Sequence, residues 1–307
     1  MKDVAREAGV ALGTVSRYLN GESVKKANCE AIEAAINKLG YVQNPIAKTM
    51  KTGKSMTVGV LVPVLSNMFS MRIIESVEKY LQKYGYSVIV SSSGNSESKQ
   101  AKRLGMLKNK MADGIVLMPC SESSAAIAES IGDTPVVLID RVLDENLFDS
   151  VTVSNKDTVY DRVSALIRSG YKRFGIIDGP ADVYTAKQRR LGYDAALKDN
   201  GLTSVFEARG DYNVESGYNI ANRLGDTELD VLFVANHEMT IGVIKAYASL
   251  KHKPKLLGFD SLEIGSPEGA SFIMQPVEEI GTRAAELLLR RMSGKADGIT
   301  STVIRID

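Results

Sequence analysis

The sequence is poor in the residues that build disulfides and metal sites. Its 307 residues include two histidines and two cysteines, Cys29 and Cys120. Two cysteines far apart in the chain give neither a disulfide framework nor the spacing of a zinc site, and they fit a reducing compartment. The sequence also shows no apolar signal peptide at its start and no run of 18 apolar residues. We therefore expect a cytoplasmic protein without a membrane segment, a metal site or a cofactor.

Sequence patterns of catalysis are absent too. Neither histidine has a recognisable catalytic partner in the sequence, and no nucleophile–base pair or triad can be assembled. The segment TGKS at 52–55 matches the end of a phosphate-binding loop, but position 48, where the pattern needs glycine, is lysine. The strand that should precede the segment is expected after it. We expect that the protein is not an enzyme.

Charge is unevenly distributed along the chain. Residues 1–55 contain nine Lys or Arg and five Asp or Glu, whereas the remaining residues contain 29 and 32. The net charge of +1 therefore combines +4 in the N-terminal segment with −3 in the rest. A basic segment favours an anionic partner, although a solvated charged face has the same composition.

The first 40 residues show the pattern of three short helices. The first would end at Gly9, which can adopt the left-handed conformation, the second would cover about 12–20, and the third about 28–39. Apolar residues at helical spacing would form one small core: Val4, Ala5, Ala8, Val15, Leu19, Ile32, Ile36 and Leu39. Such a unit can present its second helix to the major groove of DNA, although an ordinary helical hairpin would look the same.

The N-terminal sequence closely resembles the DNA-binding head and hinge of the lactose-repressor (LacI/GalR) family. The resemblance rests on DVAREAGV at 3–10, TVSRYLN at 14–20 and AIEAAINKLGYVQNPIAKTMKTGKS at 31–55. It extends over essentially the whole chain. It implies a helix-turn-helix head at 1–43, a hinge helix and linker at 44–56, and an effector-binding body at 57–307.

The resemblance also implies which residues contact DNA. Arg17 would reach a base edge, since arginine can form bidentate hydrogen bonds to guanine, and Met50 would take the position of a wedge in the minor groove. Ala11 replaces the serine that usually caps the recognition helix, so this helix would begin less firmly. The implied DNA-binding residues are Leu12, Gly13, Thr14, Ser16, Arg17 and Met50.

From residue 57 onward, apolar runs alternate with helical patterns. Continuous apolar runs are typical of buried parallel strands, and their alternation with helices indicates two doubly wound α/β halves, as in type I periplasmic binding proteins. The runs cover 57–64, 86–92, 113–119, 134–140, 173–179, 204–210, 230–236 and 255–260. We assign about 57–154 plus 282–296 to an N-subdomain and about 155–281 plus 297–307 to a C-subdomain.

Polar and aromatic residues follow the predicted strands, where two such sheets would form a cleft at their carboxyl ends. Any one of them could be a turn former or a helix cap. Together they suit a polyhydroxylated ligand, whose hydroxyls donate and accept hydrogen bonds and whose apolar face can stack on rings. The candidate effector-binding residues are Asn67, Phe69, Asp140, Arg141, Arg189, Tyr212, Asn236, Asp260 and Gln275.

The resemblance assigns the same positions to effector binding, with three departures, one of which is Lys187 in place of a frequent arginine. Ser70 stands where the family often has a second aromatic residue, and His237 replaces an aspartate; we interpret His237 as a helix-start residue. The implied function is a regulator, expected to be a repressor, that binds a near-palindromic operator as a homodimer. Its effector would be a sugar or sugar derivative, with nucleobases and nucleosides as the second choice. The alternative is a solute-binding protein without a regulatory role.

Overall fold

The structure is a computed structural model that describes residues 1–42, 49, 53–110, 112–120, 123–143, 147–225, 227–260 and 268–306. The chain divides into two compact units, Met1–Met56 and Thr57–Asp307. The second unit contains both of the sheets described below.

The first unit contains three short helices, as expected. They are α1 (Lys2–Glu7), α2 (Leu12–Leu19) and α3 (Lys26–Leu39). The core consists of Val4, Ala5, Val15, Ile32 and Ala35. Gly9, between α1 and α2, has a φ of 63°, which glycine adopts without steric cost. The prediction for Leu39 was wrong: it is 44% exposed, because it is the last residue of α3 and the chain that follows supplies Tyr41 to the core instead.

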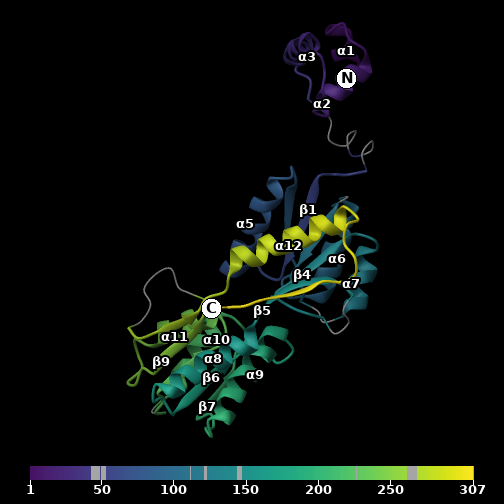
Figure 1. The fold of residues 1–307 in the computed structure, drawn as a ribbon. Coiled ribbons are helices and arrows are strands. Elements are labelled where there is room, and N and C mark those ends of the chain that lie inside the picture. The colour runs from purple at the N-terminus through teal and green to yellow at the C-terminus, as the bar shows by residue number, and fades with distance from the viewer. Residues whose placement is uncertain are drawn as a thin grey trace. The chain divides into compact units, whose positions relative to one another are not determined.

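The first sheet of the second unit has six parallel strands in the order β11–β5–β4–β3–β1–β2. The strands are β1 (Thr57–Val62), β2 (Ser87–Ser92), β3 (Gly114–Leu117), β4 (Val136–Ile139), β5 (Asp149–Val153) and β11 (Ser301–Ile304). The associated helices are α5 (Met68–Gln82), α6 (Glu97–Asn109), α7 (Ser124–Ile131) and α12 (Val277–Met292). Helix α12 runs beside α5 and contacts β3, β4 and β5, so a late segment of the chain completes this half (Figure 1).

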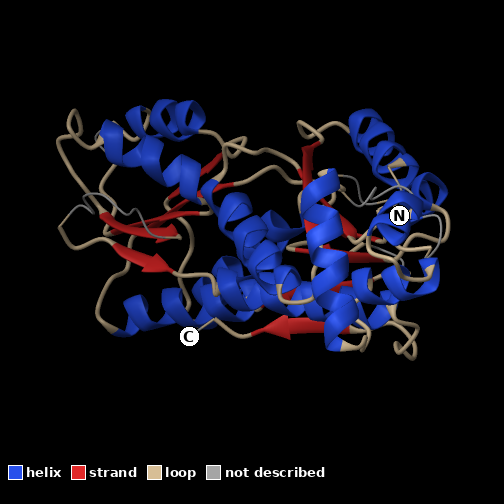
Figure 2. Ribbon diagram, turned by 90° about the horizontal axis from the view of Figure 1, so that it is seen from above, coloured by secondary structure: helices blue, strands red, loops and turns tan. Residues whose placement is uncertain are grey.

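The second sheet has five parallel strands in the order β10–β9–β8–β6–β7. The strands are β6 (Phe174–Asp178), β7 (Phe206–Arg209), β8 (Val231–Val234), β9 (Lys255–Phe259) and β10 (Ser271–Ile273). The associated helices are α8 (Asn155–Arg168), α9 (Tyr184–Asp199), α10 (Val214–Asn222) and α11 (His237–Ala246). Helices flank the strands on both sides, which is the doubly wound arrangement expected from the sequence (Figure 2).

One subdomain boundary needs correction. Residues 301–304 were assigned with 155–281, but they form β11, which pairs with β5 from Ser301↔Ser150 to Ile304↔Val153. The C-terminal strand therefore lies at the edge of the first sheet. The pairing is reinforced by Asp149, which accepts hydrogen bonds from the Thr300 backbone N–H and from the Arg291 guanidinium.

Helix α11, which begins at the carboxyl end of β8, is positioned by an unusually close approach to α10. A Cβ atom on Gly242 would lie 2.1 Å from the carbonyl oxygen of Val214, and one on Gly217 would lie 2.3 Å from that of Met239. Only glycine allows the two backbones to come this near. The contact fixes α11 closely beside α10.

Candidate functional site

The described part of the head exposes one side of α2. Val15 is fully buried, whereas Leu12, Gly13 and Arg17 are exposed. The N-cap of α2 is Ala11, which makes no side-chain hydrogen bond, as the sequence indicated. The predicted residues Thr14 and Ser16 are half-buried on the same helix. The exposed side of α2 can therefore meet an external partner while Val15 holds the helix to the core.

Two predictions for the hinge cannot be compared with the structure. The wedge residue Met50, and residues 44–48 and 51–52 of the predicted hinge helix and linker, lie outside the described residues. Their assignment stays a prediction.

Three of the predicted effector-binding residues share an uncommon backbone conformation. Asp140, Tyr212 and Asp260 have φ values of 67°, 63° and 60°. They follow β4, β7 and β9 at their carboxyl ends. Positive φ costs energy in residues other than glycine, and such residues concentrate at functional sites. Local backbone strain thus marks the same edge of the sheets that the sequence pattern marked.

Arg189 is the most deeply buried charged residue among the predicted set, with 4% of its surface exposed. Its Nε donates to the Asn155 side chain at 2.8 Å, and its Nη1 donates to the carbonyl oxygen of Ala235 at 2.6 Å. Its guanidinium lies 3.5 Å from the ring centroid of Phe259, within the range of a cation–π interaction. Arg189 therefore ties α8, α9 and the ends of β8 and β9 together, and its role is structural as well as electrostatic.

Asp260 and Gln275 form a pair at the ends of β9 and β10. The Gln275 amide donates to one Asp260 oxygen at 2.7 Å, and the Gln275 backbone N–H donates to the other at 3.1 Å. Burial raises the pKa of the Asp260 carboxyl, and the nearby Arg189 charge and the hydrogen bonds from Gln275 oppose that rise. The Oε1 of Gln275 is left buried without a hydrogen-bond partner among the described residues.

The two predicted asparagines meet at a residue that the sequence did not single out. Asn67 caps α5 and Asn236 caps α11, each accepting a backbone hydrogen bond through its Oδ1. Their amide groups donate to the two oxygens of Glu238, at 2.6 Å each. Asn67 belongs to the first half of the body and Glu238 to the second, so this contact crosses between the halves. Burial raises the pKa of the Glu238 carboxyl, and the hydrogen bond from Asn67 opposes the rise.

Asp140 and Arg141 lie side by side at the end of β4. The Arg141 Nε is 3.8 Å from an Asp140 oxygen, and its Nη1 donates to the carbonyl oxygen of Pro119 at 2.7 Å. Burial raises the pKa of Tyr212 and of Tyr184 in the second half, and the Asp140 charge adds to both rises, so Asp140 lies near that half. Each half thus contributes acidic and basic groups to one region.

Several buried polar atoms near the carboxyl ends of the strands have no hydrogen-bond partner. Six buried side-chain atoms lack a partner among the described residues. Four of the six belong to the candidate site: Arg141 Nε, Tyr212 OH, His237 Nδ1 and Gln275 Oε1. Buried polar groups in proteins are nearly always hydrogen-bonded, and each exception needs an explanation. Their concentration at the carboxyl ends of the strands indicates a site built for a polar ligand.

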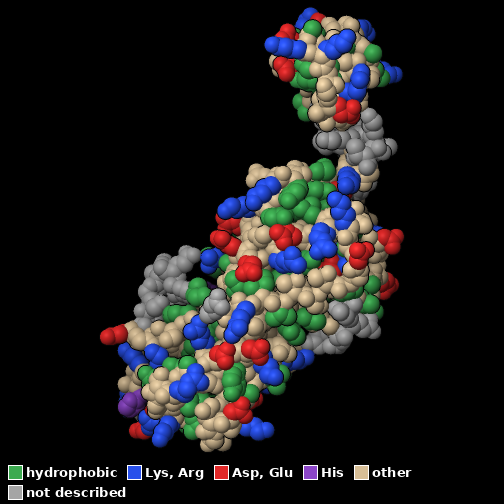
Figure 3. Space-filling model, in the orientation of Figure 1, with side chains coloured by type: hydrophobic (Ala, Val, Ile, Leu, Met, Phe, Trp, Pro, Cys, Tyr) green, Lys and Arg blue, Asp and Glu red, His purple; other side chains and the backbone are tan. Residues whose placement is uncertain are grey.

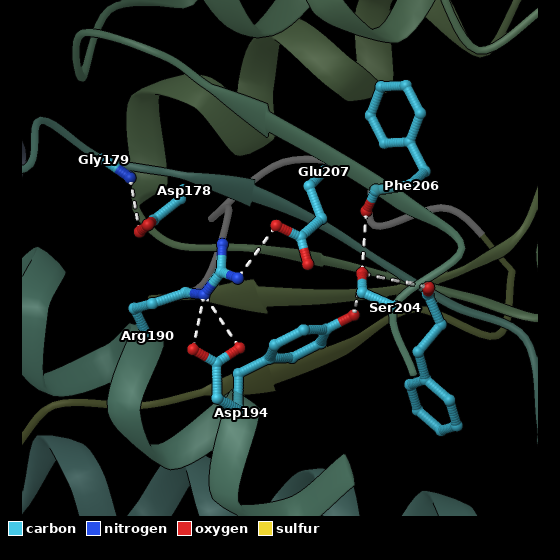
Figure 4. A network of polar contacts seen from close by, with 9 residues as sticks. Asp178, Gly179, Arg190, Asp194, Ser204, Phe206 and Glu207 are labelled. Atoms are coloured by element: carbon cyan, nitrogen blue, oxygen red, sulfur yellow. Dashed lines mark hydrogen bonds and ion pairs between the residues drawn. The ribbon is translucent and has the colours of Figure 1, made fainter. Parts of the chain in front are cut away.

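The structure adds Asp178 to the candidate site. This carboxylate ends β6, accepts a hydrogen bond from the Gly179 backbone N–H at 2.8 Å, and has its pKa raised by burial (Figure 4). The ring of Tyr212 lies so close to Gly179 that a Cβ there would clash with it. Arg190, drawn in the same view, forms ion pairs with Asp194 and Glu207, so its charge is already balanced (Figure 4).

The structure brings several of the predicted residues together and adds three residues that contact them or lie beside them, while their role in effector binding stays a prediction. The added residues are Asn155, Asp178 and Glu238, each in or next to the turn that follows a strand. His237 begins α11, as expected from the sequence. The sequence did not indicate that its Nδ1 would be buried without a hydrogen-bond partner among the described residues. Phe69 is half-buried in the first turn of α5.

Metal and membrane signals are absent from the part of the chain that the structure describes. No group of three His, Cys, Asp or Glu residues there could hold a metal ion. None of the described helices is long and apolar enough to span a membrane. On the visible face of the body, acidic and basic side chains are interspersed (Figure 3).

Comparison with known proteins agrees with this architecture. Residues 1–44 match the model of bacterial regulatory proteins of the lacI family, and residues 55–306 match that of periplasmic binding proteins and the sugar-binding domain of the LacI family. The chain belongs to the LacI family. Like other LacI-family chains, it is a DNA-binding transcriptional regulator, and its curated relatives are regulators and not enzymes.

Individual LacI-family proteins match over nearly the whole chain. Catabolite control protein A of Priestia megaterium is 30% identical over 99% of this chain and 95% of its own length. The ribose operon repressor of Escherichia coli K12 is 30% identical over 95% of this chain and 93% of its own. The lac repressor dimer bound to operator and the anti-inducer ONPF superposes with a TM-score of 0.87 at 22% identity, covering 99% and 96% of the two chains. The fold of the chain is therefore that of the lac repressor.

Proposed function

We propose that the protein is a homodimeric repressor that binds a near-palindromic operator through α2 and responds to a small polyhydroxylated effector bound between the two halves of its body. The DNA contacts would come from the exposed side of α2 and from the hinge, with Met50 as the minor-groove wedge. The effector would be a sugar or sugar derivative, held by the predicted residues together with His237 and Glu238.

The observation that carries this proposal is the cluster of unpartnered buried polar atoms. An unmade hydrogen bond in a buried position costs about 1–3 kcal/mol, so four of them at one site are a substantial penalty. A ligand with several hydroxyls removes the penalty, because each hydroxyl can donate to Gln275 Oε1 or accept from Arg141 Nε. The binding of such a ligand would favour one arrangement of the two halves over others, which is the basis of a ligand-driven switch.

The experiment is an electrophoretic mobility shift with DNA from upstream of the protein's own gene, with and without candidate sugars and nucleosides. We expect specific binding that one class of compound alters. Arg17→Ala should abolish specific binding, since it removes a donor to a base edge. Arg6→Ala removes the same charge from α1, where Arg6 is paired with Asp3, and should retain specificity. If the chain binds no upstream segment better than random DNA, the proposal is wrong.

A further inference from the structure

The Glu238 carboxylate occupies the place in the site that would best hold an anion. Asn67 and Asn236 cap two different helices, and their Oδ1 atoms are taken by the backbone N–H groups of Ser70 and Met239. Only their amide N–H groups remain to donate, and both donate to Glu238. The N-termini of α5 and α11 stabilise negative charge, and the negative charge beside them is a carboxylate of the protein itself.

The cationic groups of the site lie beside carboxylates of the protein. Arg189 donates to Asn155 and to the Ala235 carbonyl, and Asp260 lies close enough for the two charges to interact. Arg141 lies beside Asp140. Arg141 Nε has no hydrogen-bond partner among the described residues, but a carboxylate or phosphate that accepted from it would lie beside the Asp140 carboxylate, and one near Arg189 would lie beside Asp260.

One acceptor atom of the site, in contrast, lacks a donor. Gln275 is 7% exposed, and its Oε1 has no hydrogen-bond partner among the described residues. Its amide nitrogen donates to Asp260, which identifies the other amide atom, Oε1, as the one left to accept a hydrogen bond. A ligand group next to Oε1 must donate a hydrogen bond, which a hydroxyl can do and an ionised carboxylate group cannot.

We propose that Glu238 is a specificity-determining residue that restricts the site to uncharged, hydrogen-bond-donating effectors and excludes their acidic and phosphorylated counterparts. The inference rests on the proposed effector site and specifies its ligand class. Like charges brought together in a poorly solvated site cost several kcal/mol, which is enough to discriminate between otherwise identical ligands.

The test compares matched ligand pairs on the full chain at one ionic strength by calorimetry. The pairs are ribose and ribose 5-phosphate, glucose and glucuronate, galactose and galacturonate, and adenosine and its 5′-monophosphate. Glu238→Gln keeps the size of the side chain and removes its charge. Glu207→Gln is the matched control, because Glu207 is exposed and pairs with Arg190 away from the two asparagines.

In any ligand pair that binds, we expect the wild type to bind the neutral ligand at least about tenfold more tightly than the anionic ligand, consistent with the cost of like charges. Glu238→Gln should reduce the ratio of the two dissociation constants about tenfold, and Glu207→Gln should leave this ratio unchanged. An anion that binds the wild type more tightly than its neutral counterpart overturns the inference, as does a ratio that Glu238→Gln leaves unaltered. If no member binds and none alters operator binding, the proposed effector function fails, and this inference fails with it.

Discussion

At the scale of single residues, Tyr212 has two parts with different roles, a ring that packs in the fold and a hydroxyl that a ligand could bind. Its ring packs on Gly179, and its hydroxyl is buried near the Thr185 side chain without a hydrogen bond of good geometry to any described residue. The ring therefore stabilises the fold, whereas the hydroxyl costs free energy until a ligand supplies a partner.

Replacing Tyr212 with phenylalanine should reveal both roles. The variant keeps the packing and removes the unpaired hydroxyl, so the free energy of unfolding without effector should be unchanged or slightly higher. Effector affinity should fall by about 1–3 kcal/mol, the cost of one buried hydrogen bond. Chemical denaturation and calorimetry measure the two quantities. A loss of stability in the absence of effector together with an unchanged effector affinity would show that the hydroxyl is structural.

The sequence indicated which polar residues follow the strands, but it did not indicate which of these residues contact each other. Asp140, Asn236 and Asp260 could be found because apolar runs end directly before them. Glu238 could not, because a glutamate in the first turn of a helix is ordinary in sequence. Its importance arises from Asn67, which lies far away in the chain and comes near only when the two halves are assembled.

At the scale of elements, the sequence predicted strands well where they were uniformly apolar. It missed β5, because Asp149, Ser150 and Thr152 interrupt the pattern although all three are buried. Asp149 can be buried because the Arg291 guanidinium and the Thr300 backbone N–H donate hydrogen bonds to its carboxylate oxygens. It also placed β11 in the wrong half, because strand pairing across a long separation leaves no local signal.

The crossing of α10 and α11 gives a prediction at this scale. Gly242→Ala should destabilise the body by more than about 1 kcal/mol and weaken effector binding, because the new Cβ pushes α11 and its Asn236 cap away from α10. Gly105→Ala on α6 is the control: a Cβ there meets nothing within 4 Å, so the change should stabilise the helix by up to about 1 kcal/mol. Denaturant unfolding of the two variants measures the difference, and equal effects would contradict the close approach.

At the scale of the whole molecule, the chain joins a DNA-binding head to an effector-binding body. The central claim is that the two binding events are coupled. Thermodynamic linkage requires that a change in operator affinity caused by the effector is matched by an equal change in effector affinity caused by the operator.

The most direct measurement of this claim is the dissociation constant of the effector, by calorimetry, with and without saturating operator duplex. The account predicts a change of about 5- to 150-fold, equal to the factor by which the effector changes operator affinity. The body alone, residues 57–307, should bind the effector without any response to operator. An effector affinity that the operator leaves unchanged in the full chain would contradict the account.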